Sequence, residues 1–125
     1  MLLEEAGYDK AAHNRKIAQI KGRGYKSIHL IIEALADAYC CLYDLEDSSE
    51  INNGMCEDFA EDLMSLLVEP EMNTIWLDEL SSSPYFPAHK VLLYKGKYFD
   101  SECPDGVVDW KDLPICKRSK YFPNL

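Results

Sequence analysis

Apolar residues recur at helical spacing through the first half of the chain. The pattern is loose from about Leu2 to Ile20, and Gly22-Arg23-Gly24 then ends it. The next segment carries a stronger stripe with spacings of three and four residues, which predicts a long core helix. Its members are Ile28, Ile31, Ile32, Leu35, Ala38, Tyr39, Leu42 and Leu45.

A turn-rich segment, residues 47–54, separates this helix from a third one. Met55, Phe59, Leu63, Leu66 and Leu67 again follow a period near that of an α-helix. We expect Asn52 or Asn53 to cap this helix. We expect it to end before Pro70, because proline disfavours helical geometry in the preceding residue.

Beyond Pro70 the pattern becomes extended. Short runs of strand-forming residues predict strands at about 74–77, 88–94 and 97–102, with a last strand or turn at 107–110. Residues 81–87 read as a loop with two prolines, and Lys95-Gly96 as a hairpin tip. We therefore expect an α+β fold in which N-terminal helices pack on a small antiparallel sheet.

The composition fits one soluble domain spanning residues 1–125, since 47% hydrophobic residues supply enough apolar surface for one core. The net charge of -9 repels phosphates and excludes nucleic acid as an expected partner. No apolar run has the length of about 20 residues that spans a bilayer, and the acidic start is unlike a secretory signal. We expect a cytoplasmic protein that does not bind membranes.

The five cysteines are an odd number and contain no C-x-x-C pair, which is typical of free thiols in a reducing compartment. Three scattered histidines do not complete a zinc site. We expect neither a metal nor another cofactor.

Cys56 lies in the first turn of the third predicted helix, where unpaired N–H groups and the helix dipole favour a thiolate. Four carboxylates within two turns oppose this effect, because they raise the pKa of the thiol. They belong to Glu57, Asp58, Glu61 and Asp62. A nucleophilic Cys56 therefore requires a positively charged histidine beside it.

His89 is the candidate for that partner. A two-residue tip at Lys95-Gly96 pairs Tyr94 with Lys97, which places Asp100 diagonally from His89 on the same face of the hairpin. Asp100 can then orient the imidazole, and Glu102, directly opposite, is a rival for this role.

Together these residues predict nucleophilic catalysis in which His89 takes the thiol proton and Cys56 attacks an acyl carbon. The Cys56 backbone N–H and the side-chain amide of Asn52 or Asn53 are candidates for stabilising the oxyanion, although either amide can serve only as a cap. Trp76 can line the substrate cleft, or belong to the core as aromatic residues on strands commonly do.

Three segments resemble the core of the papain-like cysteine peptidase superfamily, most closely its transglutaminase-like branch: Asn53–Ala60, Ala88–Val91 and Gly96–Asp100. The resemblance implies Cys56 as nucleophile, His89 as base and Asp100 as orienting acid. It covers residues 50–112 as the catalytic core and leaves 1–24 as a helical extension. The papain-type oxyanion glutamine is Glu50 here, and an aromatic residue often found beyond the histidine is Val91.

The resemblance implies a thiol-dependent acyl-transfer enzyme: a peptidase, transamidase or deamidase. Its expected substrate is a peptide or protein, for which the acidic charge favours basic character. The alternative is a noncatalytic binding or inhibitory protein that retains the fold and selects a basic partner.

Overall fold

Helices precede the sheet along the chain, as the hydrophobic pattern predicts. The computed structural model describes residues 9–67, 69, 71–80 and 89–118. The elements are α1 (Lys10–Arg23), α2 (Ile28–Tyr43), the 3₁₀ helix η2 (Ser48–Asn53), α3 (Cys56–Leu67), β1 (Asn73–Trp76), η3 (Leu77–Glu79), β2 (Lys90–Tyr94), β3 (Lys97–Asp100), β4 (Cys103–Val107), η4 (Trp110–Asp112) and α4 (Pro114–Arg118). The α+β class is thereby confirmed.

Polar caps define the starts of the first two helices. The Asp9 carboxylate accepts the Ala12 N–H at 3.1 Å, and the Ser27 hydroxyl accepts the Leu30 N–H at 3.2 Å. The prediction that Asn52 or Asn53 caps α3 is wrong, because both residues belong to η2 and α3 begins only at Cys56.

The four strands form an antiparallel sheet in the order β1-β2-β3-β4. Tyr94 pairs with Lys97 and Leu92 with Phe99, so the predicted hairpin register is confirmed. Lys95 and Gly96 at the tip both have positive φ, 51° and 77°, as the two central residues of a type I′ turn require.

The end of the sheet differs from the prediction. β4 starts at Cys103 and ends at Val107, so the chain turns back after Asp100 sooner than the expected strand 97–102 allows. Of the predicted last strand or turn at 107–110, Val107 ends β4, and residues 108–109 form a bend that leads into η4, as the turn alternative predicts. The early turn places Ser101 and Glu102 directly behind Asp100.

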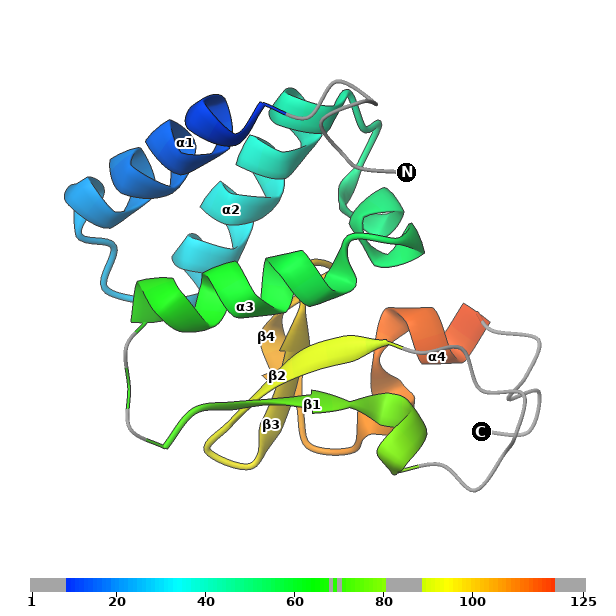
Figure 1. Cartoon of the computed structure of the whole chain (residues 1–125). Coiled ribbons are helices and arrows are strands. Elements are labelled where there is room, and N and C mark those ends of the chain that lie inside the picture. The colour runs from blue at the N-terminus through cyan, green and yellow to red at the C-terminus, as the bar shows by residue number, and fades with distance from the viewer. Residues whose placement is uncertain (1–8, 68, 70, 81–88, 119–125) are drawn as a thin grey trace.

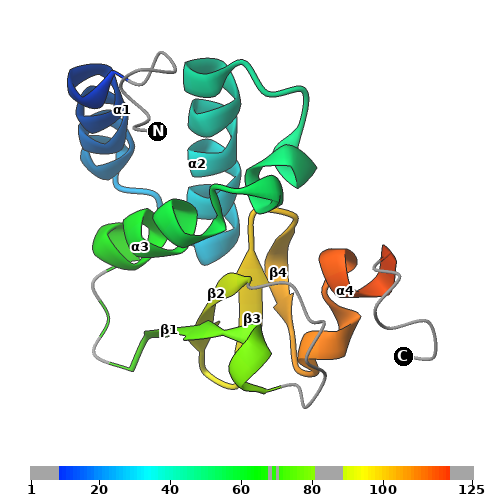
Figure 2. The same cartoon turned by 45° about the vertical axis from the view of Figure 1, so that its right-hand side comes forward.

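Helix α3 lies between α1 and the sheet, and α2 contacts both α3 and strand β4 (Figures 1 and 2). The larger hydrophobic cluster joins these layers, with Phe59 and Leu63 of α3 packed in the same cluster as Leu92 and Phe99 of the sheet. A second cluster joins Val91 of β2 to Leu77 of η3, to Leu113 just before α4 and to Cys116 of α4. The packing brings α3 into contact with β2.

Parts of the predicted organisation cannot be compared with the structure. The start of the predicted first helix before Asp9, residue 70 and the loop 81–87 lie outside the described residues. In the part that is described, no helix is both long and apolar enough to cross a membrane.

Candidate functional site

Cys56 is the first residue of α3, and only 8% of its surface is exposed. The helix position leaves its own N–H without an intrahelical acceptor. Backbone N–H groups of Glu57 and Lys90 donate toward its sulfur. The thiol is therefore surrounded by donors that favour its ionised form.

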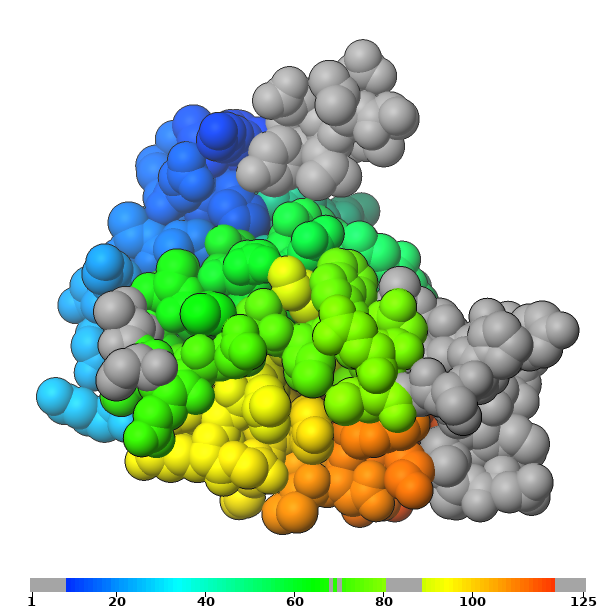
Figure 3. Space-filling view, turned by 60° about the horizontal axis from the view of Figure 1, so that its bottom comes forward, coloured from blue at the N-terminus to red at the C-terminus, as the bar shows by residue number. Residues whose placement is uncertain are grey.

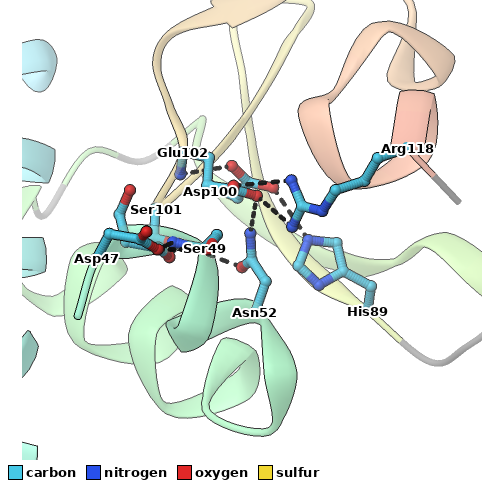
Figure 4. A network of polar contacts seen from close by, with 9 residues as sticks. Asp47, Ser49, Asn52, His89, Asp100, Ser101, Glu102 and Arg118 are labelled. Atoms are coloured by element: carbon cyan, nitrogen blue, oxygen red, sulfur yellow. Dashed lines mark hydrogen bonds and ion pairs between the residues drawn. The ribbon is translucent and has the colours of Figure 1, made fainter. Parts of the chain in front are cut away.

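His89 and Asp100 form a buried pair, with exposed fractions of 2% and 3% (Figure 4). The His89 Nε2 lies 3.0 Å from Asp100 Oδ2. The other oxygen of this carboxylate accepts the backbone N–H of Glu102 at 2.9 Å. Both oxygens are thus occupied, which fixes the carboxylate plane behind the imidazole.

The thiol of Cys56 interacts with the His89 ring from the other side. Because Nε2 is bound to Asp100, Nδ1 is the nitrogen left for the sulfur. Nδ1 is buried and makes no hydrogen bond of regular geometry within the described structure, so its contact with the sulfur is poorly aligned. Such loose geometry is common in catalytic sites without substrate.

The charges of this pair favour a thiolate and an imidazolium. Burial opposes ionisation of Cys56, but His89 and the surrounding backbone N–H groups outweigh it, so the pKa of the thiol lies below its ordinary value of 9.0. Burial also disfavours protonation of His89, but Asp100 and Cys56 together raise its pKa to about 9.

Three other cysteines have the opposite electrostatic character. Burial, helped by nearby carboxylates, raises the pKa of Cys103 to about 11 and that of Cys116 to about 12. The pKa of Cys40 is raised for the same reasons. Cys56 therefore ionises more readily than these three thiols.

Glu102 does not orient His89 in this structure, although the sequence makes it a rival of Asp100. Its carboxylate accepts two hydrogen bonds from the Arg118 guanidinium, both at 2.8 Å, and one from Asn52 Nδ2 at 2.9 Å (Figure 4). The Asn52 carbonyl accepts the Ser101 hydroxyl at 3.3 Å. Asn52 thus supports the turn after Asp100, and its amide is already engaged there.

Asn53 and Trp76, the other predicted oxyanion and cleft residues, lie in different surroundings. Asn53 is exposed in η2. Trp76 is partly buried at the end of β1, where the Lys90 ammonium lies 5.4 Å from the centre of its ring. The structure therefore brings together Cys56, His89 and Asp100. Glu102 and Asn52 lie behind Asp100 and contact each other.

Two functional candidates escaped the sequence reasoning. Arg118 belongs to a short basic cluster that reads as solvated surface, yet it forms a forked pair with Glu102. Lys90 reads only as the next residue of a strand, yet it bonds to Glu61 and lies 3.9 Å from Glu57. The four carboxylates near Cys56 could have indicated Lys90 from the sequence, because their negative charge favours a second cation besides the histidine.

Comparisons of the chain with protein-family models, curated proteins and solved structures gave no match. Within the described segments, no group of three or more histidine, cysteine, aspartate and glutamate side chains is arranged to hold a metal ion. The chemistry of the site must therefore be argued from its own residues.

Proposed function

We propose that the chain is a thiol-dependent acyl-transfer enzyme of the transglutaminase-like kind, with Cys56 as nucleophile, His89 as acid and base, and Asp100 as the residue that orients His89. The observation that carries the proposal is the buried His89–Asp100 pair, 3.0 Å between Nε2 and Oδ2, beside a thiol at a helix start. The three side chains come from the start of α3, from the residue before β2 and from the end of β3. The sequence Cys56, His89, Asp100 supports the roles that acyl transfer needs.

The reaction proceeds in two halves. The thiolate of Cys56 attacks the carbonyl carbon of an amide, and the His89 imidazolium gives its proton to the departing amine, which leaves a thioester on Cys56. His89, now neutral, removes a proton from the acceptor, water or an amine, as it attacks the thioester. Collapse of the second intermediate returns the thiolate and the imidazolium.

The substrate class follows from the site and the charge of the chain. An amide in a peptide or protein, at the backbone or at a glutamine side chain, supplies the acyl carbon. The net charge of -9 favours substrates of basic character by raising their local concentration near the surface. Neither a metal nor another cofactor takes part in the proposed steps.

Selective alkylation tests the proposal. We expect iodoacetamide at about pH 6 to label Cys56 at least tenfold faster than Cys103 or Cys116, because only the thiolate reacts. Peptide mass spectrometry measures the labelling of each cysteine. An activated aryl ester should in addition leave an acyl group on Cys56, with release of one equivalent of the alcohol.

His89→Gln should remove both effects, whereas His29→Gln is the matched control. His29 is a surface histidine that pairs with Glu33 and Asp105, away from the thiol. Equal labelling of Cys56 and the exposed Cys41 at low pH, or acylation that persists in His89→Gln, would refute the proposal.

A noncatalytic binding protein is the second candidate. It is favoured by a groove of about 640 Å³ between α2 and the β3–β4 turn, whose lining includes five carboxylates. They belong to Glu33, Asp37, Glu46, Asp47 and Glu102. A basic peptide that binds equally well to the wild type and to Cys56→Ser, with no acyl group on Cys56 from any ester, would favour this candidate.

A further inference from the structure

Lys90 has an unusual environment for a lysine next to a candidate nucleophile. Its side chain is only 12% exposed. The ammonium group bonds to the Glu61 carboxylate, lies 3.9 Å from Glu57 Oε2, and lies 5.4 Å from the centre of the Trp76 ring. Figure 3 shows atoms in the yellow of β2 enclosed between α3 and the β1–η3 segment.

Both acidic partners of Lys90 lie on α3 close to Cys56. Glu57 is the next residue, and Glu61 follows one turn later on the same side of the helix. Their carboxylates are more than half exposed, with exposed fractions of 59% and 52%, and would disfavour a negative sulfur at the helix start. The backbone N–H of Lys90 donates toward that same sulfur.

We propose that Lys90 is a positioning residue of the candidate active site: its ammonium neutralises Glu57 and Glu61 and fixes the first turns of α3 beside β2, so that Cys56 is held as a thiolate. This inference rests on the proposed function. In this proposal two cations, the His89 ring and the Lys90 ammonium, offset the negative charge of the carboxylates at the start of α3. Histidine alone does not have to do so.

The titratable groups closest to Cys56 along α3 and at the edge of the sheet are all in the described structure. Glu57, Asp58 and Glu61 project from α3. His89 directly precedes β2, Lys90 is the first residue of β2, and Asp100 from β3 acts through His89. With Lys90 replaced by a neutral residue, Glu57 and Glu61 lose the ammonium group that they share.

The pH dependence of Cys56 alkylation tests this role without any substrate. We expect Lys90→Met, which keeps the apolar stem, to raise the midpoint of the alkylation profile by about half a unit to one unit. At about pH 6 this slows alkylation roughly three- to tenfold. Lys90→Arg keeps the charge and should keep the midpoint, and Lys97→Met at the exposed start of β3 is the matched control.

Substitution of the two carboxylates provides a second test of this role. Glu57→Gln/Glu61→Gln in the Lys90→Met protein should return the midpoint to the wild-type value, which a purely structural role of Lys90 would not allow. The same pair of substitutions with Lys90 intact should lower the midpoint, and this variant keeps the proposal testable if Lys90→Met does not fold.

The outcomes separate the two proposals. A wild-type midpoint at or above pH 9.0, the ordinary value for the thiol, would refute the proposed function itself. A low wild-type midpoint that does not move in Lys90→Met would overturn only the role of Lys90. A midpoint that stays raised after Glu57 and Glu61 are neutralised would also overturn it.

Discussion

At the scale of single residues, Asp100 shows how a buried carboxylate can be held in one orientation. One oxygen faces the His89 ring, and the other accepts the Glu102 N–H. Because the side chain is 97% buried, water cannot replace either partner. The same carboxylate therefore keeps the imidazole protonated and aimed at Cys56.

Replacing Asp100 with asparagine should weaken the nucleophile. The neutral amide removes the main interaction that raises the pKa of His89 to about 9, so the ring is protonated to a smaller extent at neutral pH. Without the imidazolium, the pKa of the Cys56 thiol rises toward its ordinary value. We expect alkylation of Cys56 at about pH 6 to slow by about tenfold.

Labelling kinetics and an NMR titration of His89 measure this effect. Ser101→Ala is the control, because the Ser101 hydroxyl donates to the Ser48 carbonyl and to the Asn52 side chain. An unchanged His89 pKa in Asp100→Asn would contradict the assignment of Asp100 as the orienting acid.

At the scale of elements, a polar network joins α1, α2 and α3 on the far side of α3 from the sheet. Asp62 Oδ2 lies 2.8 Å from His13 Nε2 and accepts the Tyr39 hydroxyl at 2.5 Å. The His13 Nδ1 lies 2.5 Å from the Tyr43 hydroxyl. Burial, with Asp62 nearby, raises the pKa of Tyr39, so this hydroxyl stays protonated and acts as a donor.

Asp62→Ala should loosen the attachment of α1. The Tyr39 hydroxyl and the His13 ring would lose their shared acceptor, and an unsatisfied buried polar group costs about 1 to 3 kcal/mol. We expect the free energy of unfolding to fall by about 2 kcal/mol and amide protection to fall first in α1.

Urea unfolding and hydrogen exchange measure these changes. Ser65→Ala, at an exposed hydroxyl that donates to the Asp62 backbone carbonyl within α3, is the control. Equal loss of protection in α1 and in β2 would show that Asp62 supports the whole domain instead of the α1 attachment.

At the scale of the whole molecule, several negative charges gather in one groove. The groove between α2 and the β3–β4 turn is lined by five carboxylates, and none of its lining residues, all within the described structure, is basic. Together with the net charge of -9, this arrangement destabilises the compact state by repulsion.

Asp37→Asn/Glu46→Gln should therefore stabilise the protein. Both residues line the groove. We expect the free energy of unfolding at low ionic strength to rise by about 0.5 to 1 kcal/mol, and the gain to shrink in salt as the repulsion is screened. Urea unfolding at two salt concentrations measures this, with Lys10→Gln on the exposed start of α1 as a comparison expected to show no gain. A gain that is independent of salt would argue against repulsion as its cause.

Local patterns in the sequence determined the type and order of most elements. The apolar stripe from Ile28 predicts α2, and the Lys95-Gly96 tip predicts the register that places Asp100 near His89. These features follow from backbone geometry and hydrophobic periodicity, which act over a few residues. The position of Cys56 at the start of α3 follows from the same kind of local signal.

Only the tertiary structure decided which long side chains meet. Glu102 bonds to Arg118 and Asn52 instead of His89, and Lys90 lies against α3. These contacts depend on how α3, α4 and the sheet are placed relative to one another, which no local period encodes. A charged side chain in the sequence has several possible partners, and the packing of distant elements selects the one that it reaches.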